Sequence, residues 1–192
     1  LKRSFYQDGH FYGEWTSGDF FRDEDFVQNV FITSNHKNLL CFTNVGKVYN
    51  LKVYQIPEAS LRSRGKHFAN LINFEKHEQV VSVLPVSAFK EGHFVFSVTQ
   101  KGNIKKTELM AYANVRSNGI IGLKLEDQDS LVGCEIGEKG DEILLATRFG
   151  KAIRFSEGEV RLVGRASKGV TGMRFSNPKD RVIGVELLRG AQ

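Results

Sequence analysis

Basic side chains recur at matching places along this chain, and the chemistry open to them is the binding of phosphate groups. Lysine and arginine attract phosphates by charge, and arginine adds a pair of parallel hydrogen bonds. Some of these residues lie in loops just before a glycine, and others lie on or beside short runs of β-forming residues. The candidate phosphate-binding residues are Lys2, Arg3, Lys47, Lys52, Arg62, Arg64, Lys66, Lys105, Lys106, Arg116, Lys151, Arg154, Arg165 and Lys168.

The residue types that usually carry catalysis show no productive spacing. The five histidines include no His-x-x-x-His pair, and Cys41 and Cys134 stand 93 residues apart, so a zinc site has little support. Neither a Gly-x-Ser-x-Gly nucleophile turn nor a Gly-x-x-x-x-Gly-Lys-Ser/Thr phosphate loop occurs. We therefore expect no catalytic site, no metal site and no cofactor in this chain.

The composition is that of a folded, water-soluble protein. The chain has 192 residues, with 27 Lys and Arg against 22 Asp and Glu, and 41% of its residues are hydrophobic. A chain of this length buries roughly 70% of its unfolded surface without help from a disulfide, so we expect Cys41 and Cys134 to be reduced thiols in the core. The apolar runs are far shorter than the ~20 residues of a membrane helix. A net charge of +5 favours a polyanionic partner without identifying it.

An internal repeat of about 50 residues organises the chain. Three segments that begin with an acidic residue, Glu78–Val83, Asp129–Cys134 and Asp180–Val185, match at every apolar position and start 51 residues apart. A looser copy begins at Asp25. Upstream of each matching segment lies a Thr-x-x-Gly sequence followed by an apolar and basic run, and these sequences begin at Thr43, Thr99 and Thr147.

Each unit of the repeat predicts four strands. A short β-forming run comes first, the glycine after it predicts a tight hairpin turn, and a second strand pairs back antiparallel. A polar loop with a second glycine leads to a third strand, and the acidic segment is the fourth. Four strands in about 50 residues are typical of a propeller blade. The first three strands are expected at 39–43, 48–53 and 68–74, at 94–98, 104–109 and 120–125, and at 143–147, 153–155 and 170–175.

The repeats predict a single all-β, propeller-like domain over residues 1–192. About three complete blades are expected at 38–92, 93–141 and 142–192, with a partial N-terminal blade at 1–37. Because the chain starts inside one blade and stops where the next should begin, we expect it to be a fragment of a longer protein that covers the open sheet edges.

Two stretches resemble a known family. Residues 42–59 read Phe-Thr-Asn-Val-Gly-Lys-Val-Tyr-Asn-Leu-Lys-Val-Tyr-Gln-Ile-Pro-Glu-Ala, and residues 146–172 contain Ala-Thr-Arg-Phe-Gly-Lys-Ala-Ile-Arg-Phe and Gly-Arg-Ala-Ser-Lys-Gly-Val-Thr-Gly. Both resemble blades of the C-terminal DNA-wrapping domain of the bacterial DNA gyrase A protein, a β-pinwheel. The likeness extends over about residues 24–189. The C-terminal domain of topoisomerase IV shares this fold and is the close competitor.

The resemblance implies a non-catalytic part of an ATP-dependent type II topoisomerase. In that family the outer rim of the blades is basic and bends duplex DNA, which supports negative supercoiling. The implied partners are double-stranded DNA, the gyrase A N-terminal cleavage domain and the gyrase B protein, without a membrane. ATP and Mg would be needed only in those other parts, and the location would be the bacterial cytoplasm, on the nucleoid. The strongest candidates for sequence-independent phosphate contacts are Arg62, Arg64, Lys66, Arg165 and Lys168.

The N-terminal segment departs from the family pattern. A basic, glycine-rich box, usually Gln-Arg-Arg-Gly-Gly-Lys-Gly, should follow the strand that residues 1–4 match, yet no Lys or Arg occurs between Ser4 and Phe21. Either the box is disordered and missing from this sequence, with its flanks joined in the numbering, or an aromatic, acidic loop replaces it. The second case would favour a topoisomerase IV-like role in which the domain selects DNA crossings.

A protein-interaction propeller is the alternative from another functional class. In such a protein the positive charge would be incidental, and an apolar or mixed-charge patch would lie at one end of the central channel. A DNA-binding set of blades would instead carry its cations on one continuous outer rim.

Overall fold

The computed structural model describes residues 6–7, 10–11, 32–58 and 67–189, and the structural statements below refer to these residues. Their regular elements are β-strands and short 3-10 helices, with no α-helix. The strands are β1 (Tyr6–Gln7), β2 (His10–Phe11), β3 (Asn38–Thr43), β4 (Lys47–Lys52), β5 (Val80–Val86), β6 (His93–Thr99), β7 (Asn103–Glu108), β8 (Ile120–Ile121), β9 (Leu131–Glu138), β10 (Glu142–Thr147), β11 (Ala152–Ser156), β12 (Val170–Thr171) and β13 (Val182–Leu188). The 3-10 helices are η1 (Val53–Gln55), η2 (Phe68–Asn70), η3 (Leu109–Tyr112) and η4 (Glu157–Glu159).

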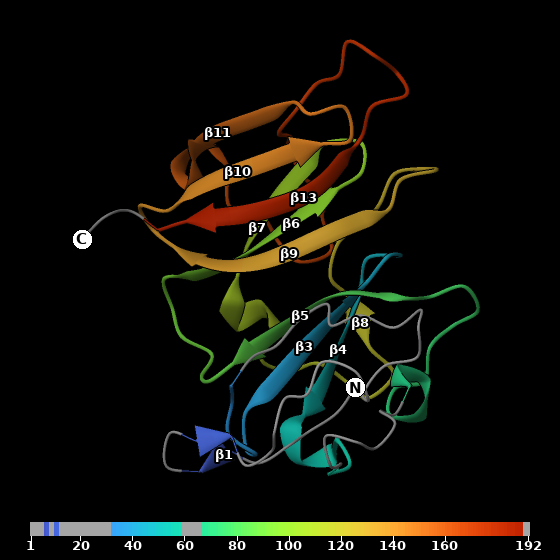
Figure 1. Ribbon diagram of the computed structural model, residues 1–192, viewed down its shortest axis with the longest axis vertical. Coiled ribbons are helices and arrows are strands. Elements are labelled where there is room, and N and C mark those ends of the chain that lie inside the picture. Colours follow the sequence, from blue (N-terminus) through green and yellow to red (C-terminus); the bar gives the residue numbers. More distant parts are fainter. Residues whose placement is uncertain (1–5, 8–9, 12–31, 59–66, 190–192) are drawn as a thin grey trace.

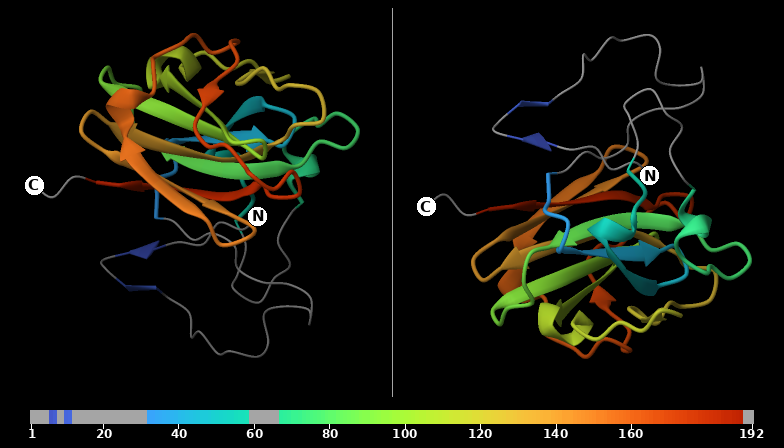
Figure 2. Two further views of the ribbon diagram at one scale, coloured as in Figure 1. Left: turned by 90° about the horizontal axis from the view of Figure 1, so that it is seen from above. Right: turned by 90° about the horizontal axis from the view of Figure 1, so that it is seen from below.

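Three antiparallel sheets follow one another along the long axis of the molecule (Figures 1 and 2). Their strand orders are β5-β3-β4-β8, β9-β6-β7-β12 and β13-β10-β11, while β1 and β2 form a separate pair. The strands β5, β9 and β13 lie side by side at one edge of the stack, where the Ser82 hydroxyl of β5 donates to the Cys134 carbonyl of β9 at 3.1 Å. The opposite, outer edge of the first two sheets is formed by β8 and β12. This all-β stack of blade-like sheets confirms the predicted fold class.

The third strand of each unit differs from the expectation. The predicted strand at 68–74 is wrong, because η2 and turns occupy that segment. The strands expected at 120–125 and 170–175 have only two residues each, and they pair with the preceding sheet rather than with their own: β8 pairs with β4, and β12 pairs with β7. Each of these units therefore contributes one strand to the blade before it.

The glycines that follow β8 and β12 explain why these strands are short. The Gly122 amide donates to the Gly46 carbonyl at 2.8 Å, and the Gly172 amide donates to the Gly102 carbonyl at 2.8 Å. The chain leaves the sheet edge at these points because its next amides bind the hairpin turn of the preceding blade instead of a strand. The two docked turns tie successive units together.

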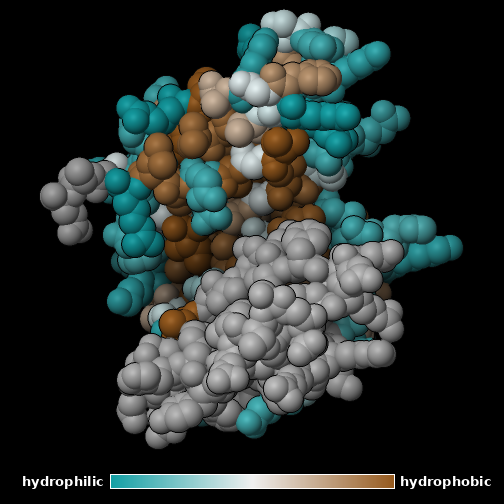
Figure 3. All heavy atoms as spheres, in the orientation of Figure 1, coloured by the Kyte–Doolittle hydropathy of each residue, from teal (hydrophilic) through white to brown (hydrophobic). Residues whose placement is uncertain are grey.

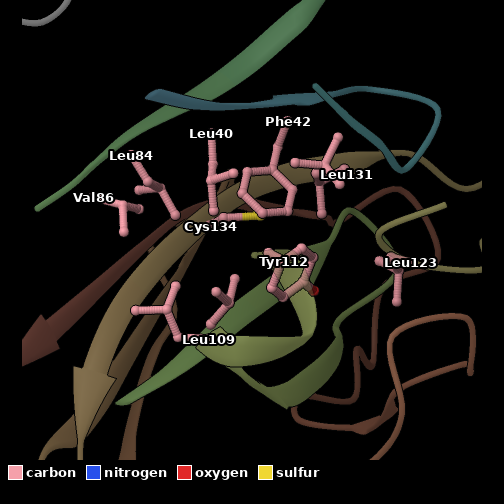
Figure 4. Close-up of a cluster of buried hydrophobic side chains, with 11 residues drawn as sticks. Leu40, Phe42, Leu84, Val86, Leu109, Tyr112, Leu123, Leu131 and Cys134 are labelled. Atoms are coloured by element: carbon pink, nitrogen blue, oxygen red, sulfur yellow. The ribbon is translucent and has the colours of Figure 1, made fainter. Parts of the chain in front are cut away.

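Apolar clusters between the sheets hold the stack together. Leu40 and Phe42 of β3 face Leu109 and Tyr112 of η3, and the rings of Phe42 and Tyr112 meet edge-on with centroids 5.6 Å apart (Figure 4). A second cluster joins the middle and last sheets and includes Phe96, Val98, Ile104, Ile143, Leu145 and Val185. Full burial of such a side chain contributes about 1.5–3 kcal/mol, so packing between blades is a main source of stability.

Both cysteines lie in the core as free thiols, as predicted. Burial raises the pKa of Cys41 and the pKa of Cys134 to about 12. Both thiols therefore stay protonated at neutral pH and carry no redox or nucleophilic chemistry there.

The acidic residue that opens each repeat fastens the hairpin turn of its own blade. The Glu78 carboxylate accepts from the Thr43 hydroxyl at 2.8 Å and from the Tyr49 hydroxyl at 2.9 Å. Asp180 accepts from the Thr147 hydroxyl at 3.0 Å, and Asp129 accepts from the Lys101 amide at 3.0 Å. The acidic segment and the Thr-x-x-Gly sequence, which look like separate signatures along the chain, are thus two halves of one contact.

The hairpin glycines allow a direct test of how much the docked turns stabilise the stack. Gly102 and Gly150 hold equivalent places and have φ of 82° and 79°. An added Cβ would lie 2.4 Å from the Met173 carbonyl oxygen at Gly102, whereas at Gly150 it would meet no described atom within 4 Å. Both alanine variants incur the strain of a positive φ, but only Gly102→Ala must also displace the two amides bound to the Gly102 carbonyl. We expect it to lower the free energy of unfolding by about 2 kcal/mol more than Gly150→Ala does. Urea unfolding followed by circular dichroism measures the difference, and equal losses would contradict the role of the turn.

Candidate nucleic-acid interface

The loops that cross the outer edge of the blades bring two predicted arginines together. Arg116 lies in the loop between η3 and β8, and Arg165 lies in the loop between η4 and β12. Both line one open depression, whose other lining residues are Asn114, Asn118, Gly119, Ile120, Ile121 and Ala166. Arg116 is exposed and Arg165 is half-buried. The depression offers guanidinium and amide donors and no carboxylate, which is the chemistry of an anion site.

Contacts with the preceding unit hold the Arg165 loop in place. The Arg165 guanidinium donates through Nη1 to the Ile121 carbonyl at 2.6 Å. A guanidinium has five N–H donors, so donors remain for a phosphate. Farther along the loop, Lys168 is exposed, and its ammonium lies 3.5 Å from the carboxylate of Glu126. A partly exposed pair of this kind contributes little to stability and does not prevent Lys168 from meeting a phosphate.

In the second and third units, the second glycine is the point where a basic loop touches the preceding blade. A Cβ added at Gly119 would lie 2.7 Å from Cε1 of Tyr49, and a Cβ added at Gly169 would lie 2.4 Å from the Ile104 carbonyl oxygen. Only glycine permits so close an approach at these two positions. These glycines are therefore structural, and they fix the height of the basic loops above the sheet edge.

The other predicted cations are placed less uniformly. Lys151 is exposed and Lys52 is half-buried. Lys47 pairs with Glu75 at 2.5 Å, and Arg154 pairs with Glu142 at 3.5 Å, with the glutamates well exposed in both cases. Lys2, Arg3, Arg62, Arg64 and Lys66 lie outside the described residues, as does the segment where the basic box was expected.

Lys105 and Lys106 are buried, and this removes both from the proposed phosphate contacts. Lys105 is 1% exposed and Lys106 is 9% exposed. The Lys106 ammonium pairs with the Glu157 carboxylate and lies 4.3 Å from the centroid of the Phe94 ring. The two lysines were selected because basic residues recur on or beside the second strand of each unit. In the structure β12 and the loop before it, both from the following unit, cover this strand.

A second group of exposed cations lies at the hairpin-turn end of the third sheet. The turn after β10 and the loop before β13 meet there, and the Arg148 amide donates to the Arg181 carbonyl at 3.0 Å. Figure 3 shows mainly hydrophilic side chains over this loop, at the upper right of the view. Sequence reasoning singled out only Lys151 of this group, although residues 142–189 carry ten Lys or Arg against five Asp or Glu. The exposed cations are Arg148, Lys151, Arg174, Lys179 and Arg181.

Neither a metal nor a membrane site is seen in the part of the chain that the structure describes. No group of three or more His, Cys, Asp or Glu side chains there could hold a metal ion. No helix in the same part is long and apolar enough to cross a membrane.

Comparisons of the sequence and of the fold with known proteins point to the same group of domains. The family model of the DNA gyrase C-terminal domain, a β-propeller, matches residues 37–87, 93–137 and 141–189. The chain belongs to the DNA gyrase C-terminal domain family. The resemblance stated from the sequence is thereby confirmed.

Relatives of this gyrase-family chain are longer proteins. It is 38% identical over 178 residues to the DNA gyrase A protein of Salmonella typhimurium, covering 93% of this chain and 20% of the relative. It is 44% identical over 151 residues to the DNA gyrase A protein of Clostridium acetobutylicum, covering 79% of this chain and 18% of the relative. The chain thus spans about a fifth of the length of these curated relatives.

Solved structures with the same fold include both members of the pair that the sequence could not separate. The C-terminal domain of DNA topoisomerase IV matches with a TM-score of 0.79 and 29% identity, covering 90% of this chain and 54% of that one. The DNA gyrase A C-terminal domain matches with a TM-score of 0.66 and 25% identity, covering 80% of this chain and 48% of that one.

Proposed function

We propose that this gyrase-family chain binds and bends duplex DNA, independently of base sequence, for a type II topoisomerase. The observation that carries the proposal is the meeting of Arg116 and Arg165, from two successive units, in one depression at the outer edge of the stack. The repeat places similar loops on successive blades, so a phosphate backbone that follows the edge meets cations from each blade in turn.

The chemistry of the site supports contact with phosphates rather than with bases. Charged and amide donors on loops bind phosphate oxygens whatever the base sequence is. The described residues include no helix that could enter a major groove. Salt dependence is then the expected signature, because each neutralised phosphate contributes about −0.9 to the log-log slope.

Bending follows from the way that contacts are spread over the blades. Curving 20–30 base pairs by 40–90° costs roughly 1–6 kcal/mol, and a protein offsets that cost by the extra contacts the bend permits. Loops on successive blades, such as those of Arg116 and Arg165, would supply such contacts to a duplex that curves along this edge. Further exposed cations, at the turn end of the third sheet, are available for phosphate contacts.

In the complete enzyme we assign this chain a geometric role. It would hold DNA so that a crossing forms, in support of negative supercoiling. Strand cleavage would belong to the gyrase A N-terminal domain, and ATP and Mg would act in that domain and in the gyrase B protein. The bacterial cytoplasm, on the nucleoid, is the matching location. A topoisomerase IV-like selector of DNA crossings is the variant of this proposal in which the chain bends DNA without wrapping it.

Apolar surface supports a second candidate function, a docking surface for another protein. Figure 3 shows apolar residues gathered over the third sheet and β9. Ile183 and Leu188 of β13 are 56% and 37% exposed, and Ile153 of β11 is 38% exposed. In that alternative the basic loops would be ordinary solvated surface.

A topology assay separates these possibilities. The protein is bound to relaxed circular DNA, a type I topoisomerase is added, and the linking number is read from a gel. A linking-number change that grows with the protein-to-DNA ratio supports wrapping, and binding without a change supports the crossing selector. An absence of binding leaves the protein-docking alternative.

The Arg62→Ala/Arg64→Ala/Lys66→Ala variant tests the cluster that the sequence singled out. It should flatten the slope of log affinity against log salt concentration by about two to three, and an unchanged slope would remove that cluster from the interface.

A further inference from the structure

A buried ammonium lies beneath the depression that Arg116 and Arg165 line. Lys105, in the middle of β7, donates from Nζ to the Gly122 carbonyl at 2.5 Å and to the Arg165 carbonyl. Its side chain is among the most completely buried in the described part of the chain. Burying an ammonium is costly unless its donors are satisfied, and these two carbonyls satisfy it in part.

The two carbonyls belong to the two segments that carry the proposed DNA contacts. Gly122 follows β8 and the Arg116 loop, and its amide is bound to the turn of the first blade. Arg165 belongs to the loop of the next unit, and its own guanidinium donates back to Ile121 at 2.6 Å. Lys105 and the Arg165 side chain therefore form a double tie across the junction between two units. Without the ammonium, the backbone at Arg165 would lose one of these ties.

The fold does not itself require a lysine at this place. Counting from the hairpin glycine, Lys105 corresponds to Tyr49 in the first blade and to Ile153 in the third. Tyr49 directs its hydroxyl to Glu78 of its own blade, and Ile153 is partly exposed. A buried charge is generally no better for stability than an apolar residue of similar size. The lysine is thus better explained by what it holds than by the folding of the blade.

We propose that Lys105 is a positioning residue for DNA binding: its ammonium holds the Arg165 loop against the Gly122 segment, so that phosphates meet a preformed pair of arginines. This inference rests on the proposed function.

The protonation of Lys105 makes the tie sensitive to pH. Burial, together with the nearby charge of Arg165, lowers the pKa of Lys105 to about 8, although a Coulombic interaction with Cys134 acts in the opposite direction. Tyr112 of η3 also faces this junction, and its hydroxyl donates to the Gly122 carbonyl at 3.3 Å. Burial raises the pKa of Cys134 to about 12 and raises that of Tyr112 further still, so neither titrates between pH 7 and 9. In that range Lys105 loses its positive charge, and the neutral amine that remains makes weaker hydrogen bonds to the two carbonyls than the ammonium does.

The test compares Lys105→Met with wild type and with Tyr49→Phe, a control at the equivalent place in the first blade. Binding of a labelled 40-base-pair duplex is measured at constant ionic strength from pH 7 to 9. We expect wild-type affinity to fall about tenfold over this range, and Lys105→Met to bind about tenfold more weakly at pH 7 with a flat pH profile. Because methionine suits a buried site, the thermal midpoint of Lys105→Met should not fall. Tyr49→Phe should keep the wild-type profile.

Two results would overturn the inference while leaving the proposed function intact. One is wild-type affinity for DNA in Lys105→Met, and the other is a pH profile that the substitution does not change. If Lys105→Met fails to fold, the wild-type profile decides, because a flat profile from pH 7 to 9 contradicts the tie. If wild type binds no duplex at any pH, the proposed function itself fails.

Discussion

Replacing Arg116, Arg165 and Lys168 together by alanine should weaken duplex binding about a hundredfold at 0.1 M salt. The same variant should flatten the dependence of log affinity on log salt concentration by about two to three, because three phosphate contacts disappear. The loss should be the same for unrelated DNA sequences, since these side chains bind phosphates rather than bases. Fluorescence anisotropy with two duplexes of different sequence measures both quantities.

A charge-matched variant is the control for a general effect of net charge on DNA binding. Lys37, Lys90 and Lys139 lie on connections between strands other than the loops that carry Arg116 and Arg165, and none of them lines the depression. Their replacement by alanine removes the same total charge, and we expect the salt slope to change by less than about one. If the two triple variants weaken binding equally, binding depends on the net positive charge of the protein and not on where the charges lie. The outer-edge site is then refuted.

Glu157→Ala should produce the largest loss of stability among single substitutions of charged residues in the described part of the chain. Glu157 is 4% exposed, and it pairs with the buried ammonium of Lys106 while also accepting from the Gly140 amide at 3.2 Å. Removing one partner of a buried pair leaves the other charge without compensation, which costs about 3–5 kcal/mol. The free energy of unfolding in urea measures the loss.

An exposed ion pair in the same region is the control for this variant. Glu142 pairs with Arg154 at 3.5 Å, and both side chains are well exposed. Glu142→Ala should therefore cost less than about 1 kcal/mol. A loss below about 1 kcal/mol for Glu157→Ala as well would show that water reaches Lys106 and that the pair is not buried in solution.

The same pair predicts a particular pH dependence of stability. Burial alone would raise the pKa of Glu157, but hydrogen bonds from Lys106 and Gly140 and the charges of Lys106 and Lys139 hold it below its ordinary value. A carboxylate with a lowered pKa stabilises the fold above its unfolded-state pKa, and the contribution is lost as the pH falls through the folded-state pKa. Wild type should thus lose stability in acid more steeply than Glu157→Ala.

The strands of the hairpins could be predicted from the sequence because their signals are local. β-forming runs such as 94–98, followed by a glycine suited to a tight turn, identify β6 and β7 nearly to the residue. The origin of the outermost strand could not be predicted in this way. β8 is two residues long, and its partner β4 lies about 70 residues earlier, so the pairing depends on how the units stack.

The candidate site was predictable where loops carry it and unpredictable where the next unit covers a strand. Arg116 and Arg165 were selected because each precedes a repeated glycine, and the structure places them in one depression. The sequence around Lys105 and Lys106 looks like that of a solvated strand edge. Only the docking of the following unit buries the two lysines. The Thr43–Glu78 contact was likewise hidden, since its halves are 35 residues apart.

The central claim, sequence-independent binding of duplex DNA along a basic outer edge, is tested most directly by affinity against salt concentration for two unrelated duplexes. If about six side chains meet phosphates, both duplexes should give a log-log slope near −5. Their affinities should agree within about threefold at each salt concentration. A slope shallower than about −1, or a strong preference for one sequence, would contradict the account.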